Sequence, residues 1–219
     1  LEGNYVDIDD DYIISGTGDG YAYIYYYNGI EWIEQSILQP NDGNPDFGEG
    51  VSISGDYAII GSSNNKTYIF KREGTSWVEQ FGVPLGSRSA FSDGHVSIDG
   101  EFAIIAENSE NAVYIYKRAG TERIQQARLA ESHYDASGNF GTSVAIHGDY
   151  AIVGAVWDYE GGNIIGAVFL YKRSGSAWSK VAKIVPRTSR EIIWFGRDVD
   201  LDGIHAIVGA YCEDYPYGG

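Results

Sequence analysis

Hydrophobic and polar residues alternate along short stretches of this chain, and the same arrangement returns five times. In the clearest copy, residues 144–146 alternate in hydrophobicity, a turn follows at 147–148, and the apolar run 150–153 ends at Gly154. Side chains that alternate with period two, tight glycine turns and many Val, Ile and Tyr residues are typical of β-strands. The copies lie about 45 to 55 residues apart, so the chain is a repeat protein. Their first core valines are Val6, Val51, Val96, Val144 and Val199.

Four of the five copies continue with two further strands. The third strand is rich in Tyr, Ile and Val, and in three copies it ends in a Lys-Arg pair. A turn glycine comes next, and three residues later a tryptophan, or Arg123 in the third copy, opens a fourth strand. Four strands in a unit of this length are the sequence signature of a β-propeller blade. Third strands are predicted at 21–25, 66–70, 112–116 and 167–171.

The repeats predict an all-β protein that consists of a single β-propeller domain with four-stranded antiparallel blades. No window of a dozen residues sustains the periodicity of an amphipathic helix. About four and a half blades are expected, because the last unit supplies only two strands. The chain is therefore expected to be a fragment of a larger propeller or to be completed by another chain. An unpaired edge on the strand predicted at 204–210 would be a template for such pairing. The predicted units are 1–46, 47–90, 91–139, 140–194 and the partial unit 195–219.

The acidic composition narrows the range of partners. The chain has 31 Asp and Glu against 15 Lys and Arg, which gives a formal net charge of −16. Nucleic acids and anionic membrane surfaces are bound through clustered basic residues, whereas this chain spreads several of its basic residues over separate Lys-Arg pairs. No apolar run approaches the roughly 20 residues of a membrane helix. We therefore expect neither nucleic-acid binding nor membrane insertion.

The recurring string resembles a known repeat family. Phe140-Gly is followed by Ser-Val-Ala-Ile-His-Gly-Asp-Tyr-Ala-Ile-Val-Gly-Ala and, after a loop, by Gly-Ala-Val-Phe-Leu-Tyr-Lys-Arg. This pattern is similar to the FG-GAP repeat of integrin α-subunit propellers and their relatives, and the similarity covers essentially the whole chain. The resemblance implies a propeller, commonly seven-bladed, that is secreted or displayed on the cell surface. It also implies a role in adhesion or ligand binding rather than catalysis.

Calcium is the cofactor that the resemblance implies, because integrin members hold it in an Asp-rich loop between the first two strands of a blade. The matching turns here, such as Ser54-Gly55, are predicted to be two-residue hairpins, and six to eight oxygen ligands require a longer loop. Calcium, if it binds, is therefore expected at one of two other places, and solvated carboxylates are the alternative. The two candidate sets are Asp158, Glu160 and Asn163 in the loop after Gly154, and Asp198, Asp200 and Asp202 in the fifth unit.

Aromatic residues in loops raise the alternative of carbohydrate binding, since sugar rings stack on aromatic faces. Aromatic residues that recur at one strand position in every unit are expected to pack between blades instead. Asn65-Lys-Thr fits the N-glycosylation sequon and is predicted in an exposed loop. The candidate ligand-binding residues are Trp157, Tyr159, Tyr211 and Tyr215.

No catalytic constellation is recognisable in the sequence. The four histidines lack metal-ligand spacing, no Gly-x-Ser-x-Gly elbow occurs, and Cys212, the single cysteine, has no histidine near it in sequence. The leading hypothesis is an extracellular or cell-surface, non-enzymatic propeller that binds a protein or assembles with copies of itself. A carbohydrate-binding propeller is the alternative, and a metal-dependent enzyme comes third.

Overall fold

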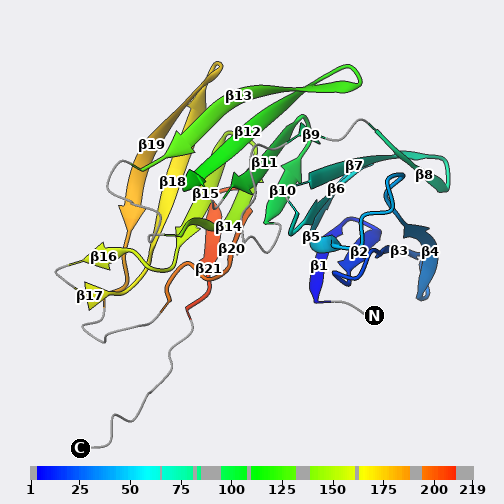
Figure 1. The fold of residues 1–219 in the computed structure, drawn as a ribbon, viewed down its shortest axis with the longest axis horizontal. Coiled ribbons are helices and arrows are strands. Elements are labelled where there is room, and N and C mark those ends of the chain that lie inside the picture. Colours follow the sequence, from blue (N-terminus) through cyan, green and yellow to red (C-terminus); the bar gives the residue numbers. More distant parts are fainter. Residues whose placement is uncertain are drawn as a thin grey trace, which may run out of the picture.

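A computed structural model describes residues 4–64, 66–80, 83–84, 95–107, 110–131, 139–160, 163–187 and 194–210. In these ranges the regular secondary structure consists of β-strands, with no α-helix. The strands form four successive antiparallel sheets, a small hairpin beside the fourth sheet and one final hairpin (Figure 1). Each of the four sheets keeps sequence order from its inner strand outwards, as expected for a propeller blade.

The first blade contains β1 (Tyr5–Asp9), β2 (Tyr12–Gly16), β3 (Ala22–Tyr27) and β4 (Trp32–Leu38). The second contains β5 (Phe47–Ser54), β6 (Tyr57–Ser62), β7 (Lys66–Glu73) and β8 (Ser76–Glu79), and β9 (Val83–Pro84) also pairs with β7. The third contains β10 (Val96–Asp99), β11 (Phe102–Glu107), β12 (Ala112–Ala119) and β13 (Glu122–Ala130).

The fourth blade contains β14 (Phe140–His147), β15 (Tyr150–Ala155), β18 (Ala167–Ser174) and β19 (Ala177–Ile184). Between β15 and β18, where the sequence predicts a loop, β16 (Tyr159–Glu160) and β17 (Asn163–Ile164) form a small separate hairpin. The partial fifth unit is the hairpin of β20 (Val199–Asp202) and β21 (His205–Val208).

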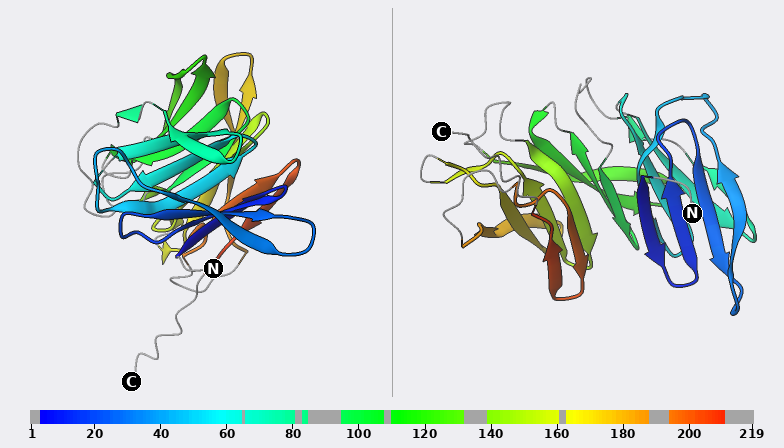
Figure 2. Two further views of the ribbon diagram at one scale, coloured as in Figure 1. Left: turned by 90° about the vertical axis from the view of Figure 1, so that its right-hand side faces the viewer. Right: turned by 90° about the horizontal axis from the view of Figure 1, so that it is seen from below.

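The predicted fold class is confirmed: the blades are present, and they form an open arc. The right-hand view of Figure 2 shows the blue hairpin β1–β2 apart from the orange-red hairpin β20–β21, and among the described residues no sheet joins them. The third strands begin within one residue of their predicted starts and run two to three residues further. The strand predicted at 204–210 is shorter, because residues 203 and 204 form the turn that precedes β21.

The hairpin turns between the first two strands lie one residue later than the sequence predicts. Ser54 pairs with Tyr57, so the two turn residues are Gly55-Asp56 rather than Ser54-Gly55. Gly55 has a φ of 56°, in the region that glycine adopts without steric cost. In the first unit Asp10 takes the same position with a φ of 48°. The turns remain two residues long, as predicted.

Close packing of backbone on backbone explains the glycines of the recurring string. A Cβ added to Gly154 would overlap the carbonyl oxygen of Gly196 in the next unit, and a Cβ added to Gly16 would overlap that of Gly48. Gly48 itself has a φ of 99°, a backbone conformation that residues with a side chain rarely adopt. These glycines are thus required where the second strand of one unit touches the Phe-Gly segment of the next.

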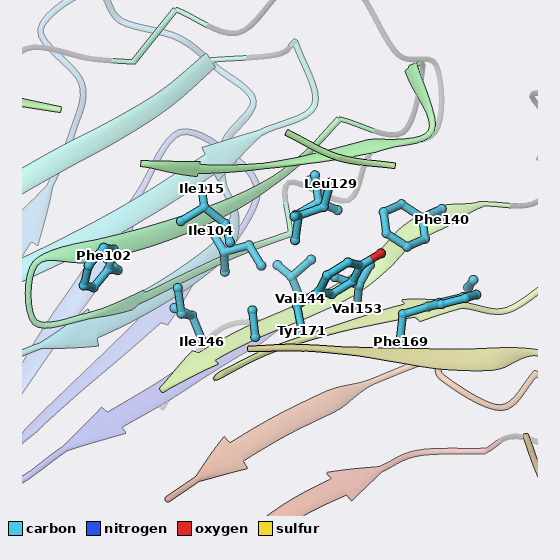
Figure 3. Packing of buried hydrophobic residues seen from close by; sticks show 14 of the residues in the cluster. Phe102, Ile104, Ile115, Leu129, Phe140, Val144, Ile146, Val153, Phe169 and Tyr171 are labelled. Atoms are coloured by element: carbon cyan, nitrogen blue, oxygen red, sulfur yellow. The ribbon is translucent and has the colours of Figure 1, made fainter. Parts of the chain in front are cut away.

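Apolar clusters fill the space between neighbouring blades. Figure 3 shows the cluster between the third and fourth blades, where Ile104 and Ile115 face Val144 and Ile146. Phe140, the aromatic residue of the recurring string, is fully buried there and makes an edge contact with Phe169. The second, third and fourth blades therefore each bury one face against the preceding unit and the other against the following unit.

Candidate interaction surfaces

Inner strands of neighbouring blades are joined by hydrogen bonds from the backbone of one strand to a side chain of the preceding strand. The acceptor stands at the same place in each unit, between two apolar residues that point the other way. These bonds satisfy buried backbone donors that the inner strand cannot pair within its own sheet. The three bonds are Ile53 N to Asp7 Oδ2 (2.9 Å), Ile98 N to Ser52 Oγ (3.1 Å) and Ile146 N to Ser97 Oγ (3.2 Å).

A second set of bonds lies two residues further along, at the turn. Here the backbone N–H of the turn glycine donates to a side chain of the preceding unit. The bonds are Gly55 N to Asp9 Oδ2 (2.6 Å), Gly100 N to Ser54 Oγ (3.1 Å) and Gly148 N to Asp99 Oδ2 (2.7 Å). Each of the first three junctions is thus held by two side-chain acceptors, which we call the latch positions.

The fourth junction lacks the first latch bond. Ala145 occupies the first latch position and has no polar side-chain atom. Leu201 N donates instead to Oδ1 of Asp200 in its own strand, at 2.8 Å. A different bond, from Ser143 Oγ to the carbonyl oxygen of Gly196 (2.9 Å), connects the two units. The fifth unit is therefore held by fewer latch bonds than the complete blades.

Burial raises the pKa of Asp7, although the N–H groups of Ile53 and Ile8 and the side chain of Ser52 bond to it and oppose the shift. The negative charge of Asp200 raises the pKa of Asp7 further. The like charges of Asp7 and Asp200 repel each other, which adds to the cost of the charged form of Asp7.

Every complete blade buries one face against the next unit. The fifth unit leaves the equivalent face exposed. Ile207, which pairs with Asp200, is 70% exposed. The residues at the same position in the four complete blades, each with an exposed fraction of 0%, are Ile14, Ile59, Ile104 and Ile152. Asp200, Asp202, His205 and Ile207 together form what we call the trailing face.

The trailing face also carries a latch acceptor in the arrangement found at the first junction. Asp7 accepts Ile8 N with Oδ1 (2.8 Å), and its Oδ2 accepts the N–H of the next blade. Asp200 accepts Leu201 N with Oδ1 at the same 2.8 Å. The other oxygen of Asp200 has no hydrogen-bond donor among the described residues. The carboxylate is therefore oriented to accept a backbone N–H from a further strand.

Every later unit buries one face against the preceding unit. The first blade leaves this face exposed, and we call it the leading face. Val6 and Ile8 are 65% and 58% exposed, whereas the residues at the same positions in the other units are at most 9% exposed. Those residues are Val51, Ile53, Val96, Ile98, Val144, Ile146, Val199 and Leu201. The leading face thus offers two apolar side chains, and the trailing face offers Ile207 with two carboxylates.

The acidic residues predicted as calcium ligands do not gather in the described part of the chain. Asp158 is 3% exposed, and its carboxylate is paired with Lys183 Nζ, at 2.9 Å from Oδ2 and 3.2 Å from Oδ1. Its carbonyl oxygen accepts Ile165 N and Gly166 N, which closes the loop. Glu160 and Asn163 pair through their backbones across β16–β17, and their side chains lie outside the described residues.

The second predicted set, Asp198, Asp200 and Asp202, is exposed along one side of β20. In the described ranges no three His, Cys, Asp or Glu side chains come together in a manner that could hold a metal ion. Calcium binding stays a prediction. The sequence predicts Asp200 and Asp202 as calcium ligands. Their equivalence to the latch residues Asp7 and Asp9 is apparent from the structure. The fixed spacing from each core valine was the signal that could have revealed it.

The candidate carbohydrate residues are only partly described. Trp157 and Tyr159 are 43% and 56% exposed near the β16–β17 hairpin. Tyr211, Tyr215 and the predicted glycosylation site Asn65 lie outside the described residues. Among the described residues, no helix has the length and apolar character needed to cross a membrane.

Comparisons with known proteins support both the repeat family and the fold class. The FG-GAP repeat family matches at residues 32–77 and 124–171. The computationally designed Ika8 protein is similar in structure, with a TM-score of 0.57 and 10% sequence identity over 94% of this chain and 54% of that chain. The N-terminal domain of Nup159 has a TM-score of 0.50 and 9% identity over 82% of this chain and 47% of that chain.

The chain therefore spans about half the length of these two solved chains, and the likeness concerns the fold alone. No curated protein matches the sequence. Three observations indicate the same architecture: the matched FG-GAP repeats, the recurring Phe-Gly string and the four sheets in an open arc. The chain carries repeats of the FG-GAP family, built as β-propeller blades.

Proposed function

We propose that this chain is a non-enzymatic β-propeller module that acts outside the cell or on its surface by binding another protein through its uncovered blade faces. The exposure of Ile207, whose four counterparts are fully buried, carries the proposal. FG-GAP repeats are typical of extracellular proteins, which supports the location.

The partner that fits best is a second copy of this chain. The trailing face needs an inner strand that brings two alternating apolar residues and backbone N–H groups, as every internal junction does. The leading face brings Val6, Ile8 and the inner-strand backbone of β1. Contact between the trailing face of one copy and the leading face of another would repeat the internal junction.

Two variants with charge in the apolar contact test this proposal. Ile207→Asp disables the trailing face, and Val6→Asp disables the leading face. Sedimentation velocity at rising concentration should show association of the unmodified protein and monomers for each variant alone. An equimolar mixture of the two variants should form a dimer, because one intact trailing face then meets one intact leading face.

The matched control is Val78→Asp on β8, which changes a residue that is 43% exposed away from both faces and should associate like the unmodified protein. Association should strengthen with salt, since each copy carries a formal charge of −16 and salt screens the repulsion. A mixture that stays monomeric, or variants that associate like the parent, would rule out the second copy as the partner.

Carbohydrate binding is the second candidate function, and the exposure of Trp157 and Tyr159 favours it. Two exposed aromatic rings near one hairpin offer stacking surfaces for a sugar. A glycan array probed with the unmodified protein and with Trp157→Ala tests this candidate. Specific signals that disappear in the variant would support it, and an array without such signals would count against it.

A further inference from the structure

The second junction, between the second and third blades, differs from its neighbours in one side chain. At the first junction Trp77 packs on Tyr12 with ring centroids 6.3 Å apart, and at the third Trp178 packs on Phe102 at 6.2 Å. At the second junction Arg123 takes the tryptophan position, and its guanidinium lies 5.8 Å from the ring centroid of Tyr57.

Each of these three junctions also contains an arginine from the third strand of the later blade. It belongs to the Lys-Arg pair at the end of the third strand, and its guanidinium lies over the same aromatic ring. The distances to the ring centroid are 4.4 Å for Arg72 over Tyr12, 4.6 Å for Arg118 over Tyr57 and 4.5 Å for Arg173 over Phe102. The second junction therefore contains two guanidinium groups beside one ring.

Among the three third-strand arginines Arg72, Arg118 and Arg173, Arg118 pairs with no carboxylate of the described residues. Arg72 pairs with Asp56, and Arg173 pairs with Asp149. Glu101 stands at the equivalent turn position of the third blade, but its carboxylate pairs with Lys117 at 3.5 Å. Within the described ranges neither Arg118 nor Arg123 forms an ion pair, although the whole chain is strongly acidic.

The hydrogen bonds of these two arginines leave donors unused. Arg118 Nη1 donates to the hydroxyl of Tyr57 (3.0 Å), and Arg123 Nη1 donates to the carbonyl oxygen of Glu101 (3.1 Å). Arg123 Nη2 is buried and has no hydrogen-bond partner in the described part of the chain. Burial and the neighbouring positive charge of Arg118 lower the pKa of Arg123 to about 10. Two like charges held together in this way favour an anion between them.

Replacing a tryptophan by an arginine also leaves space. A cavity of 260 Å³ opens at this junction. Its lining includes three cationic residues, Lys71, Arg118 and Arg123, one acidic residue, Glu122, and the polar residues Tyr57 and Gln80. Three cationic side chains, a phenol and an amide are donors suited to the oxygens of a small anion.

We propose that the cavity between the second and third blades is a binding site for an oxyanion, a carboxylate or phosphate-type group held by Arg118 and Arg123. The planar guanidinium fork matches the two oxygens of either group. The ligand fills the volume that Trp77 and Trp178 fill at the neighbouring junctions, and it supplies the negative charge that Asp56 and Asp149 supply there.

Isothermal titration calorimetry with inorganic phosphate, sulfate and succinate tests the site, in sodium chloride of matched ionic strength. The unmodified protein should bind at least one of these anions with one site per chain. Stronger binding of succinate would indicate a carboxylate ligand, and stronger binding of phosphate or sulfate would indicate a tetrahedral one. Arg123→Trp should lower the affinity at least tenfold.

Arg123→Trp installs the residue that three other units carry, so the variant should fold, and its melting temperature should no longer rise with the anion. Arg173→Gln is the matched control, since it removes an arginine from a junction that has its tryptophan and carboxylate, and it should bind like the parent. The absence of saturable binding to all three anions, or equal affinity in Arg123→Trp, would overturn the proposal.

Discussion

Ser52 and Ser54, two residues apart on β5, allow a buried latch bond to be compared with one near the surface. Ser52 Oγ accepts Ile98 N at 3.1 Å inside the second junction, and Ser54 Oγ accepts Gly100 N at the same distance near its surface. Ser52→Ala and Ser54→Ala delete the same atom from the same strand. The first change leaves a buried N–H without an acceptor and also removes the hydrogen bond of the Ser52 side chain to Asp7. The second leaves an N–H that water can reach.

The expected costs differ because of that water. An unsatisfied buried donor costs about 1–3 kcal/mol, whereas surface substitutions stay within about 0.5 kcal/mol. Ser52 is 5% exposed and Ile98 is 4% exposed, so the full penalty applies to this bond. We expect Ser52→Ala to lower the free energy of unfolding by about 2 kcal/mol, or the melting temperature by about 4–8 °C.

Urea and thermal unfolding followed by tryptophan fluorescence and circular dichroism measure both changes. Hydrogen exchange at the amide of residue 98 adds a local readout, since this amide should lose protection in Ser52→Ala and keep it in Ser54→Ala. Equal losses of stability in the two variants would show that burial does not set the strength of the latch, and the reasoning would fail.

Three further substitutions probe other parts of the arc. Asp7→Ser should stabilise the protein at pH 7, because burial raises the pKa of this acid and makes its charged form costly. The gain should shrink as the pH falls through that raised pKa and should vanish only below about 4, where the carboxyl is protonated in the folded and the unfolded state. Unfolding in urea from pH 4 to 8 measures this. Lys183→Ala should cost about 3 kcal/mol by stranding the buried carboxylate of Asp158, and melting with calcium and with a chelator shows whether calcium replaces the lost ammonium. Gly154→Ala should release the fifth unit by overlap with Gly196, seen as faster exchange in β20–β21 while the four blades stay protected.

Much of the fold could be predicted because alternation and turn glycines repeat in register. The third strands and their Lys-Arg ends were placed well, since each unit confirms the others. The two-residue turns were placed one position early, because Ser54 looks like a turn residue although it pairs with Tyr57. The β16–β17 hairpin was missed because a two-residue strand has no periodicity to detect.

The sites were harder to predict, because their chemistry depends on residues from different blades. Asp200 reads as a metal ligand in sequence, and only its equivalence to Asp7 reveals a latch acceptor. Arg123 was visible as the departure from tryptophan. Its role in the cavity depends on two further residues. Arg118 lies on the neighbouring strand β12, and Tyr57 belongs to the second blade.

The latch bonds also constrain the symmetry that any assembly of this chain can have. In every latch bond the earlier unit accepts and the later unit donates, so a junction has a direction. A two-fold dimer through the trailing face would set Asp200 against Asp200, with acceptors on both sides and no donors. Copies that join through these faces must therefore associate head to tail, in a heterologous contact. Such a contact ends in a closed ring where the accumulated rotation reaches a full turn, and otherwise it continues as a filament.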